Sequence, residues 1–207
     1  MGQVPVVVDG MTGTGKSTLV NHLAEKLNLE VMPEEFRDPY DLLNKYSQDS
    51  KWCYPMQLNF LMTRFIQYTV ASDKENYILD RSIFSDPVYA KLYYEMDHLS
   101  ETEYNNYLTF YDTLMETIKE PKCMIILTCS FDEVMNRIHE RGREDELRLG
   151  KDYWWALHKA YTEHVENIIK NRNESNSKIL EIDTENLNLD RLDEELEVVV
   201  NSAKKVL

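Results

Sequence analysis

The sequence predicts an α/β fold in which five parallel strands form one sheet with helices on both faces. Short apolar runs alternate with longer amphipathic segments along the 207 residues, without repeats or low-complexity linkers. This alternation is typical of parallel strands joined by crossover helices. The first apolar run, Val4–Asp9, leads through a glycine-rich loop into a helical pattern. We therefore expect a single domain that spans residues 1–207.

The strands are expected where short apolar runs lie between helical segments. Ligands of parallel sheets bind at the carboxyl ends of the strands, so the chemistry should lie just after these runs. The expected strands are Val4–Asp9, Leu29–Pro33, Tyr77–Asp80, Met124–Thr128 and Lys178–Ile182.

The helices are expected where apolar residues recur at helical spacing, as Leu19, Leu23 and Leu27 do. Three starts carry capping signals: Asp38 and Asp86 each precede a proline, and Ser130 to Glu133 form a capping box. The expected helices are Lys16–Leu27, Pro39–Gln48, Tyr54–Ser72, Pro87–Met96, Glu101–Ile118, Phe131–Arg141, Lys151–Asn171 and Leu189–Lys205.

The loop after the first strand fits the phosphate-binding pattern G-x-x-x-x-G-K-[ST]. Its glycines let backbone N–H groups surround a polyphosphate, and the helix that follows adds partial positive charge. Lys16 can reach the outer phosphates, and the Ser17 hydroxyl can bind Mg²⁺. The alternative, a glycine-rich turn before an ordinary helix, is disfavoured by the strand–loop–helix order. The predicted nucleotide-binding residues are Gly10, Met11, Thr12, Gly13, Thr14, Gly15, Lys16, Ser17 and Thr18.

The composition and net charge of the chain argue against several kinds of partner and location. The net charge of −14 repels nucleic acid and anionic membrane, so neither is an expected partner. No apolar run approaches the ~20 residues of a membrane span, and the first strand leaves no room for a signal peptide. The three cysteines, Cys53, Cys123 and Cys129, show neither a paired framework nor a C-x-x-C site. We expect reduced thiols and a cytoplasmic location.

Charged residues follow the second and third predicted strands. Glu34 and Glu35 come after Pro33 and could act as a base or metal ligand, or could form a solvated acidic turn. Asp80 occupies the position where phosphate-loop enzymes commonly place an acid that assists Mg²⁺. Arg81 could neutralise phosphate charge, although the two residues could also form a structural ion pair.

Three arginines gather near the end of the predicted helix that follows the fourth strand. Arg137 and Arg141 share a helix face, Gly142 ends the helix, and Arg143 follows it. Their planar, always charged guanidinium groups suit a lid over phosphates, at about residues 137–150. The alternative is ion pairing with the neighbouring acids, which could also hold the lid open without nucleotide. These acids are Glu140, Glu144, Asp145 and Glu146.

Two polar residues, Gln57 and Arg64, lie seven positions apart on one face of a mostly apolar predicted helix. An amide and a guanidinium on such a wall could read the edge of a nucleobase. On an amphipathic helix such residues more often face solvent. Trp154 and Trp155 are expected to pack the helix that contains them.

Taken together, these motifs resemble the deoxynucleoside kinases, a family that includes deoxycytidine, deoxyguanosine and deoxyadenosine kinases. The resemblance runs from Val4 to about Lys205 and rests on several motifs in the family's order. The matching segments are the phosphate loop, Val31 to Glu34, Tyr46 with Gln57 and Arg64, the DRSIFSD segment from Asp80 to Asp86, the lid from Arg137 to Arg143, and Asp152 to Leu157. The resemblance implies a phosphate-loop kinase fold with an arginine-rich lid.

The resemblance also implies a role for each matching residue. Glu34 would accept the proton of the nucleoside 5′-hydroxyl, with Asp80 as the competing assignment for this base and otherwise a Mg²⁺ ligand. Arg81 would bridge the 5′-oxygen and the transferred phosphoryl group. The donor would be ATP, held by the phosphate loop and by Arg137, Arg141 and Arg143.

The substrate would be a deoxyribonucleoside. Tyr46 and Asp152 would hold its 3′-hydroxyl, and Gln57 would bind its base, with Arg64 and Asp86 as a polar pair nearby. Asp86 could instead be a simple helix cap. The segment Glu101–Ile118 resembles a helix of the family's dimer interface, which implies a homodimer.

Some positions depart from the family pattern. Glu35 stands where the family often has a small residue, and Pro87 replaces an arginine of the deoxycytidine kinases. The Asp86–Pro87 pair resembles the bacterial deoxyadenosine kinases, so the expectation leans to deoxyadenosine, with deoxyguanosine and deoxycytidine as open alternatives.

Two other classes of protein deserve comparison. A thymidylate-type monophosphate kinase should carry an arginine after the second strand, where this chain has Glu34. A GTPase-like switch should carry D-x-x-G after the third strand, and Asp80 to Ile83 lacks the glycine.

Overall fold

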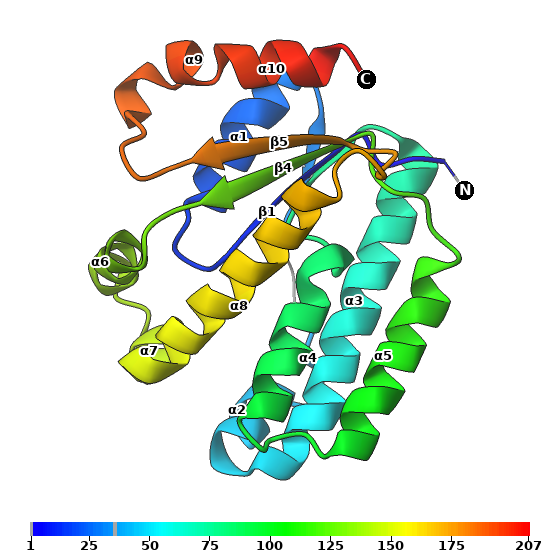
Figure 1. Cartoon of the computed structure of the whole chain (residues 1–207), viewed down its shortest axis with the longest axis vertical. Helices are drawn as coiled ribbons and strands as arrows, with labels where there is room; N and C mark the ends of the chain where they lie inside the picture. The colour runs from blue at the N-terminus through cyan, green and yellow to red at the C-terminus, as the bar shows by residue number, and fades with distance from the viewer. Residues whose placement is uncertain (1, 35–36) are drawn as a thin grey trace.

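The computed structural model describes residues 2–34 and 37–207. Five parallel strands form one sheet in the order β2-β3-β1-β4-β5 (Figure 1). In the central strand, Val8 pairs with Asp80 on one side and with Ile125 on the other. The carboxyl end of this strand therefore lies between those of its two neighbours. The strands are β1 Val6–Gly10, β2 Glu30–Met32, β3 Tyr77–Asp80, β4 Cys123–Thr128 and β5 Lys178–Asp183.

One face of the sheet is covered by α1, Lys16–Leu27, and by the C-terminal helices α9, Leu192–Glu195, and α10, Glu197–Lys204 (Figure 1). Val6 and Val8 point into this core because alternate residues of a strand face the same side. The loop that begins at the end of β1 and the helix that follows it are thus anchored by the same packed layer.

The other face carries four long helices: α3 Cys53–Lys74, α4 Asp86–Glu95, α5 Glu101–Met115 and α8 Lys151–Lys170. Val7 and Leu79 face α3 and α4, whereas Met124 and Ile126 pack against Val165 of α8. The helix α6, Phe131–Arg141, lies beyond the arrowheads of β4 and β5 and is followed by α7, Glu144–Leu147 (Figure 1). Both faces of the sheet are therefore covered, as the sequence predicts.

Most element boundaries agree with the expected ones, and α1 and α6 match them residue for residue. The expected helix at 39–48 is shorter: α2 covers Leu42–Gln48, because Asp41 adopts left-handed backbone angles. The Asp38 carboxylate still caps this helix by accepting hydrogen bonds of 2.8 and 2.9 Å from the amides of Leu42 and Leu43. Short 3₁₀ turns that the sequence pattern did not indicate are η1 Ser50–Trp52, η2 Ile83–Ser85 and η3 Leu189–Arg191.

The expected helix at 189–205 is wrong as one continuous element. It breaks at Leu196, whose φ of −99° and ψ of 2° separate α9 from α10. Leu192, Leu196 and Val200 are all buried in the core beside α1. Their spacing of four residues places them on one face of the segment, so the break leaves the apolar face on the core.

Two further expectations, the capping box at Ser130 and the packing of Trp154 and Trp155, are each confirmed only in part. The Ser130 hydroxyl accepts a hydrogen bond of 3.2 Å from the Glu133 amide, but the Ser130 amide donates to Glu185 rather than to Glu133. Trp154 packs in the core at 3% exposure, whereas Trp155 is 50% exposed. Within residues 2–34 and 37–207, no helix combines the length and apolar character needed to cross a membrane.

Candidate active site

A cleft of about 1340 Å³ opens at the carboxyl ends of the strands. Ligand pockets usually measure ~300–1,000 Å³, so this cleft has room for two small molecules side by side. It is formed by residues from the phosphate loop, α2, α3, α4, the ends of β2 and β3, and the segment around α7. The predicted site residues that line it are Thr12, Gly13, Gly15, Lys16, Ser17, Thr18, Glu34, Tyr46, Gln57, Arg64, Arg81, Arg141 and Arg143.

The phosphate loop is held in shape by its glycines. Gly13 has a φ of 89°, and a Cβ there would lie 3.0 Å from a side-chain carbon of Val134 on α6. Gly15 has a φ of 88° and precedes α1 directly, so the helix N-terminus faces the cleft. Met11 and Thr14 are each 2% exposed, which means that these two predicted residues can contribute to a ligand only through backbone groups.

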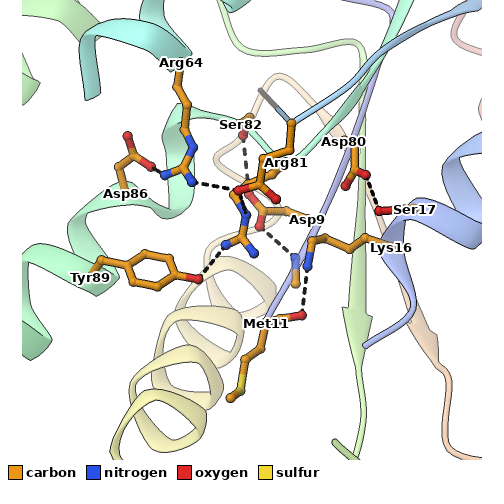
Figure 2. Close-up of polar contacts among 12 residues, drawn as sticks. Asp9, Met11, Lys16, Ser17, Arg64, Asp80, Arg81, Ser82, Asp86 and Tyr89 are labelled. Carbon is orange, nitrogen blue, oxygen red and sulfur yellow. Dashed lines mark hydrogen bonds and ion pairs between the residues drawn. The ribbon is translucent and has the colours of Figure 1, made fainter. Parts of the chain in front are cut away.

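Lys16 begins α1 and is 7% exposed. Its Nζ donates a hydrogen bond of 2.8 Å to the carbonyl oxygen of Met11 (Figure 2). Burial, reinforced by the nearby charge of Arg81, lowers the Lys16 pKa to about 7, although Glu34, Asp80 and Asp9 act in the opposite direction. Near neutral pH the Lys16 side chain is therefore divided between its neutral amine and its charged ammonium form, and an anion that enters the cleft favours the ammonium form.

Ser17 and Asp80 meet beside the phosphate loop. The Ser17 hydroxyl donates a hydrogen bond of 2.6 Å to Oδ2 of Asp80 (Figure 2). Oδ1 of Asp80 is buried without a hydrogen-bond partner among the residues described. A hydroxyl and a carboxylate are hard oxygen donors of the kind that Mg²⁺ accepts together with phosphate oxygens and water. The pair therefore fits a magnesium ion bound mainly by a nucleotide.

Glu34 stands at the end of β2 and is bound by two arginines. Its Oε1 lies 2.7 Å from Nε of Arg81 and 2.9 Å from Nη2 of Arg64. Desolvation alone would raise the pKa of this carboxyl, but the charges of Arg81, Arg64 and Lys16 outweigh it and lower the pKa to about 2. The side chain remains 38% exposed, so a charged carboxylate faces the cleft.

Arg81 is held in place by hydrogen bonds of both its backbone and its side chain. Its amide extends the pairing with β1 by donating to the Val8 carbonyl at 2.9 Å, although its φ of 69° is left-handed. Its Nη1 donates to the hydroxyls of Tyr89, at 2.9 Å, and Tyr161 (Figure 2 shows Tyr89). Sequence analysis missed both tyrosines. Tyr89 lies one helical turn after Asp86, close to the recognised motif. Tyr161 lies 80 residues from Arg81 in the sequence, in a segment without a motif.

Arg64 forms an ion pair with Asp86 in the interior (Figure 2). Asp86 is 2% exposed, and it is the first residue of α4 rather than its cap, because Ser85 occupies the cap position. The helix-cap alternative for Asp86 is therefore wrong. Gln57 and Arg64 are 4% and 9% exposed and line the cleft, so the solvent-facing alternative for these two residues is wrong as well.

Of the expected pair Tyr46 and Asp152, only Tyr46 lines the cleft. The Tyr46 hydroxyl lies 2.8 Å from Nδ1 of His98, a residue that sequence analysis did not identify. Asp152 is exposed and is absent from the cleft lining, whereas its neighbour Tyr153 is part of it. The role of Asp152 stays a prediction. Glu35, weighed above as an alternative to Glu34, lies outside the described residues.

The three lid arginines divide into two sets. Arg137 contacts the phosphate loop, with Nη1 3.5 Å from the Gly13 carbonyl, and also donates to the carbonyl of Thr184 at 2.7 Å. Arg141 and Arg143 line the cleft and are both bound by Glu146, at 2.6 and 3.5 Å. Of the four acids named above, Glu146 therefore pairs with two of the three arginines, as the ion-pairing alternative expects.

The fold and the site define a phosphotransferase: a phosphate loop faces a carboxylate across a cleft, with arginines between them. The chain belongs to the deoxynucleoside kinase family, whose model matches residues 6–207. The expected kinase activity and fold class are thus confirmed.

Individual relatives agree with this assignment. A deoxyadenosine/deoxycytidine kinase of Bacillus subtilis is 33% identical over 162 residues, which cover 75% of this chain and 74% of the relative. A deoxyadenosine kinase of Dictyostelium discoideum is 30% identical over 79% of this chain and 67% of its own length. The structure of a deoxyadenosine kinase from M. mycoides with dCMP and dCDP bound has a TM-score of 0.79 at 28% identity and covers 97% of this chain and 99% of that one.

Proposed function

We propose that this protein transfers the γ-phosphoryl group of ATP to the 5′-hydroxyl of a deoxyribonucleoside, and that deoxyadenosine is its preferred substrate. The observation that carries this proposal is the position of Glu34. A carboxylate bound by Arg64 and Arg81 faces the cleft at the end of β2. A carboxylate there suits a neutral hydroxyl and would repel a nucleoside monophosphate, which argues against the thymidylate-type alternative.

Glu34 acts on the acceptor alcohol. Its lowered pKa of about 2 keeps it ionised at neutral pH, so it accepts a hydrogen bond from the 5′-hydroxyl and orients a lone pair toward the phosphorus. Such a weak base takes the proton late, after the bond to phosphorus has begun to form. This is adequate for phosphoryl transfer, whose loose transition state depends mostly on positioning and charge. Asp80 is engaged with Ser17, which favours Glu34 over Asp80 as the base.

Positive groups stabilise the phosphates. Arg81 lies beside Glu34, where it can bridge the 5′-oxygen and the transferred group. The amides of the phosphate loop and Lys16 hold the triphosphate of ATP, and Arg141 and Arg143 close on it after leaving Glu146. Arg137 supports the loop from behind. These roles assign residues 137–150 to a lid within a single kinase domain.

Ser17 and Asp80 would hold Mg²⁺, the serine directly and the aspartate directly or through water. When bound, the ion would neutralise charge on the β- and γ-phosphates. Among the described residues, no group of three or more His, Cys, Asp or Glu side chains could hold a metal by itself. The proposed ion therefore depends on the nucleotide.

The nucleoside occupies the part of the cleft beside α3. Gln57 hydrogen-bonds the base, and the buried pair of Arg64 and Asp86 forms the polar floor near it. Tyr46 and Asp152 hold the 3′-hydroxyl, which for the exposed Asp152 requires that the first turn of α8 move toward the cleft. The preference for deoxyadenosine rests on the names of the relatives from B. subtilis and D. discoideum.

The proposal includes a cytoplasmic homodimer that associates through α5. Supporting this, Phe110 on α5 and Tyr94 on the adjacent α4 are both 37% exposed, so these two helices present aromatic surface that a partner could cover. Measurement of the molar mass in solution, with Phe110→Asp as the dissociating variant, tests this part separately.

The activity is tested by incubating the protein with ATP, Mg²⁺ and each of the four deoxynucleosides and analysing the products. The proposal predicts a deoxynucleoside 5′-monophosphate, with the highest kcat/KM for deoxyadenosine. Phosphorylation only of thymidine monophosphate would support the monophosphate-kinase class instead. Release of free phosphate without a phosphorylated nucleoside would support the GTPase-like class.

A further inference from the structure

One wall of the cleft carries three aromatic rings from three different elements. Tyr46 comes from α2, Tyr93 from α4, and His98 from the loop between α4 and α5. All three line the cleft. His98 has no role in the phosphoryl transfer proposed above.

The His98 ring is held in a fixed place. Asp97 turns the chain with a left-handed φ of 58°, and the His98 amide then donates a hydrogen bond of 2.8 Å to the Tyr93 carbonyl. The imidazole stacks on the Tyr93 ring with centroids 6.2 Å apart and an interplanar angle of 16°. Because backbone and ring are both anchored, Nδ1 has a defined direction.

Tyr46 meets this stack edge-on. Its ring centroid lies 5.3 Å from that of Tyr93 and 5.7 Å from that of His98, at interplanar angles of 72° and 67°. Its hydroxyl lies 2.8 Å from Nδ1 of His98. Burial, followed by the influence of Cys53 and Tyr153, raises the pKa of this hydroxyl, so it stays protonated. One hydrogen-bonding direction of the hydroxyl is therefore used by the imidazole and a second by the Tyr93 side chain, which leaves one for a ligand.

We propose that His98 is a positioning residue: it orients the Tyr46 hydroxyl so that this hydroxyl binds the 3′-hydroxyl of the nucleoside sugar. The inference rests on the proposed function and deepens it by adding a residue that selects sugars with a 3′-hydroxyl. Without His98, the Tyr46 hydroxyl keeps only its hydrogen bond with the Tyr93 side chain, and a bound sugar must order it further. The loss should therefore appear in nucleoside binding and only with a sugar that carries this hydroxyl.

The test compares deoxyadenosine with 2′,3′-dideoxyadenosine in steady-state kinetics. In His98→Ala, KM for deoxyadenosine should rise about tenfold, which corresponds to the loss of one hydrogen bond. In the same variant, kcat should stay within about twofold, and KM for the dideoxy substrate should not change. His98→Asn should restore most of the KM, because an asparagine amide can place a polar atom where Nδ1 lies. If another deoxynucleoside has the highest kcat/KM, the test uses that deoxynucleoside and its 2′,3′-dideoxy analogue instead.

A second comparison isolates the pair. In Tyr46→Phe, the additional change His98→Ala should have no further effect on KM, because the hydroxyl that it orients is gone. Equal losses with both sugars would show that His98 only packs the wall, and wild-type kinetics of His98→Ala would show that it has no role; either result overturns the inference. A wild-type protein that phosphorylates no nucleoside would instead refute the proposed function.

Discussion

Nε of Arg81 lies 2.7 Å from Oε1 of Glu34. Arg81 follows β3 and Glu34 follows β2, so this ion pair joins the carboxyl ends of two adjacent strands. Arg81 is 5% exposed, and two tyrosine hydroxyls hold its outer nitrogen. The cleft therefore contains a carboxylate whose position is set by buried, immobile positive charge.

Replacement of Glu34 by glutamine tests the assignment of the base. Glu34→Gln keeps the size of the side chain but cannot accept a proton, so kcat should fall about 10²–10⁴-fold. Nucleoside binding should persist, since most of the cleft is unchanged. Stopped-flow or steady-state kinetics gives kcat, and calorimetry gives the dissociation constant. Near-normal kcat in this variant, together with an inactive Asp80→Asn, would transfer the role to Asp80.

Removal of Arg81 should abolish most activity while the protein remains folded. Arg81→Ala loses the group that lies beside Glu34 and would contact the transferred phosphoryl group, a type of contribution worth about 10²–10³-fold in kcat. Tyr161→Phe removes only one of the hydroxyls that hold Arg81 and should lower kcat about tenfold. Circular dichroism checks the fold of both variants. Native-like activity of Arg81→Ala would mean that the Asp80–Arg81 segment is only structural.

The sheet was predictable because its strands are short apolar runs and because the phosphate loop marks where the first one ends. The helix α6 was predictable at both ends, since Ser130 begins it and Gly142, with a φ of 67°, ends it. The break at Leu196 was not, because Leu192, Leu196 and Val200 keep the four-residue spacing of one continuous helix on both sides of it.

The site shows the same division between local and distant information. Glu34, Asp80 and Arg81 stand in short motifs next to strand ends, so the sequence indicates them. Tyr161 and His98 lie in segments without a motif and enter the site only through long-range packing. Asp86 was ambiguous because an aspartate before a proline fits both a helix cap and an internal ion pair, and only the position of Arg64 decides between them.

The free energy of unfolding of an Asp86 variant tests whether Asp86 forms an internal ion pair or only caps a helix. Asp86→Ala leaves Arg64 buried with one partner fewer, and breaking a buried ion pair of this kind costs about 3 kcal/mol in the free energy of unfolding. Asp38→Ala is the matched control, because that carboxylate only caps α2 and its loss should cost about 1 kcal/mol. Urea unfolding followed by fluorescence measures both. Equal effects of the two changes would contradict the ion-pair interpretation.

The affinity for ATP should depend on pH through Lys16. Burial lowers the pKa of this ammonium group to about 7, so below pH 7 the empty protein carries the charge and above it the group is neutral. Binding of the triphosphate above pH 7 must then take up a proton, and kcat/KM for ATP should fall by up to about tenfold per pH unit. Glu34 stays ionised over this range, because its pKa is about 2.

Calorimetry of ATP binding at pH 8, in buffers with different ionisation enthalpies, counts the protons taken up. The control is Lys16→Arg, whose guanidinium is charged throughout and should bind without proton uptake. A wild-type protein that takes up no proton at pH 8 would show that Lys16 is already charged in the empty cleft.

The proposed lid should close over ATP more easily when Glu146 loses its charge. Glu146 holds Arg141 and Arg143 away from a ligand, and ion pairs near a surface are worth up to about 1 kcal/mol, or about fivefold in binding. Glu146→Gln should therefore lower KM for ATP up to about fivefold, whereas Arg141→Ala should raise KM for ATP more than KM for the nucleoside. Glu163→Gln is the matched control, because Glu163 pairs with Lys91, which does not line the cleft. An unchanged KM for ATP in Glu146→Gln would mean that the arginines leave Glu146 at no cost, and a rise would mean that Glu146 orders the lid for binding.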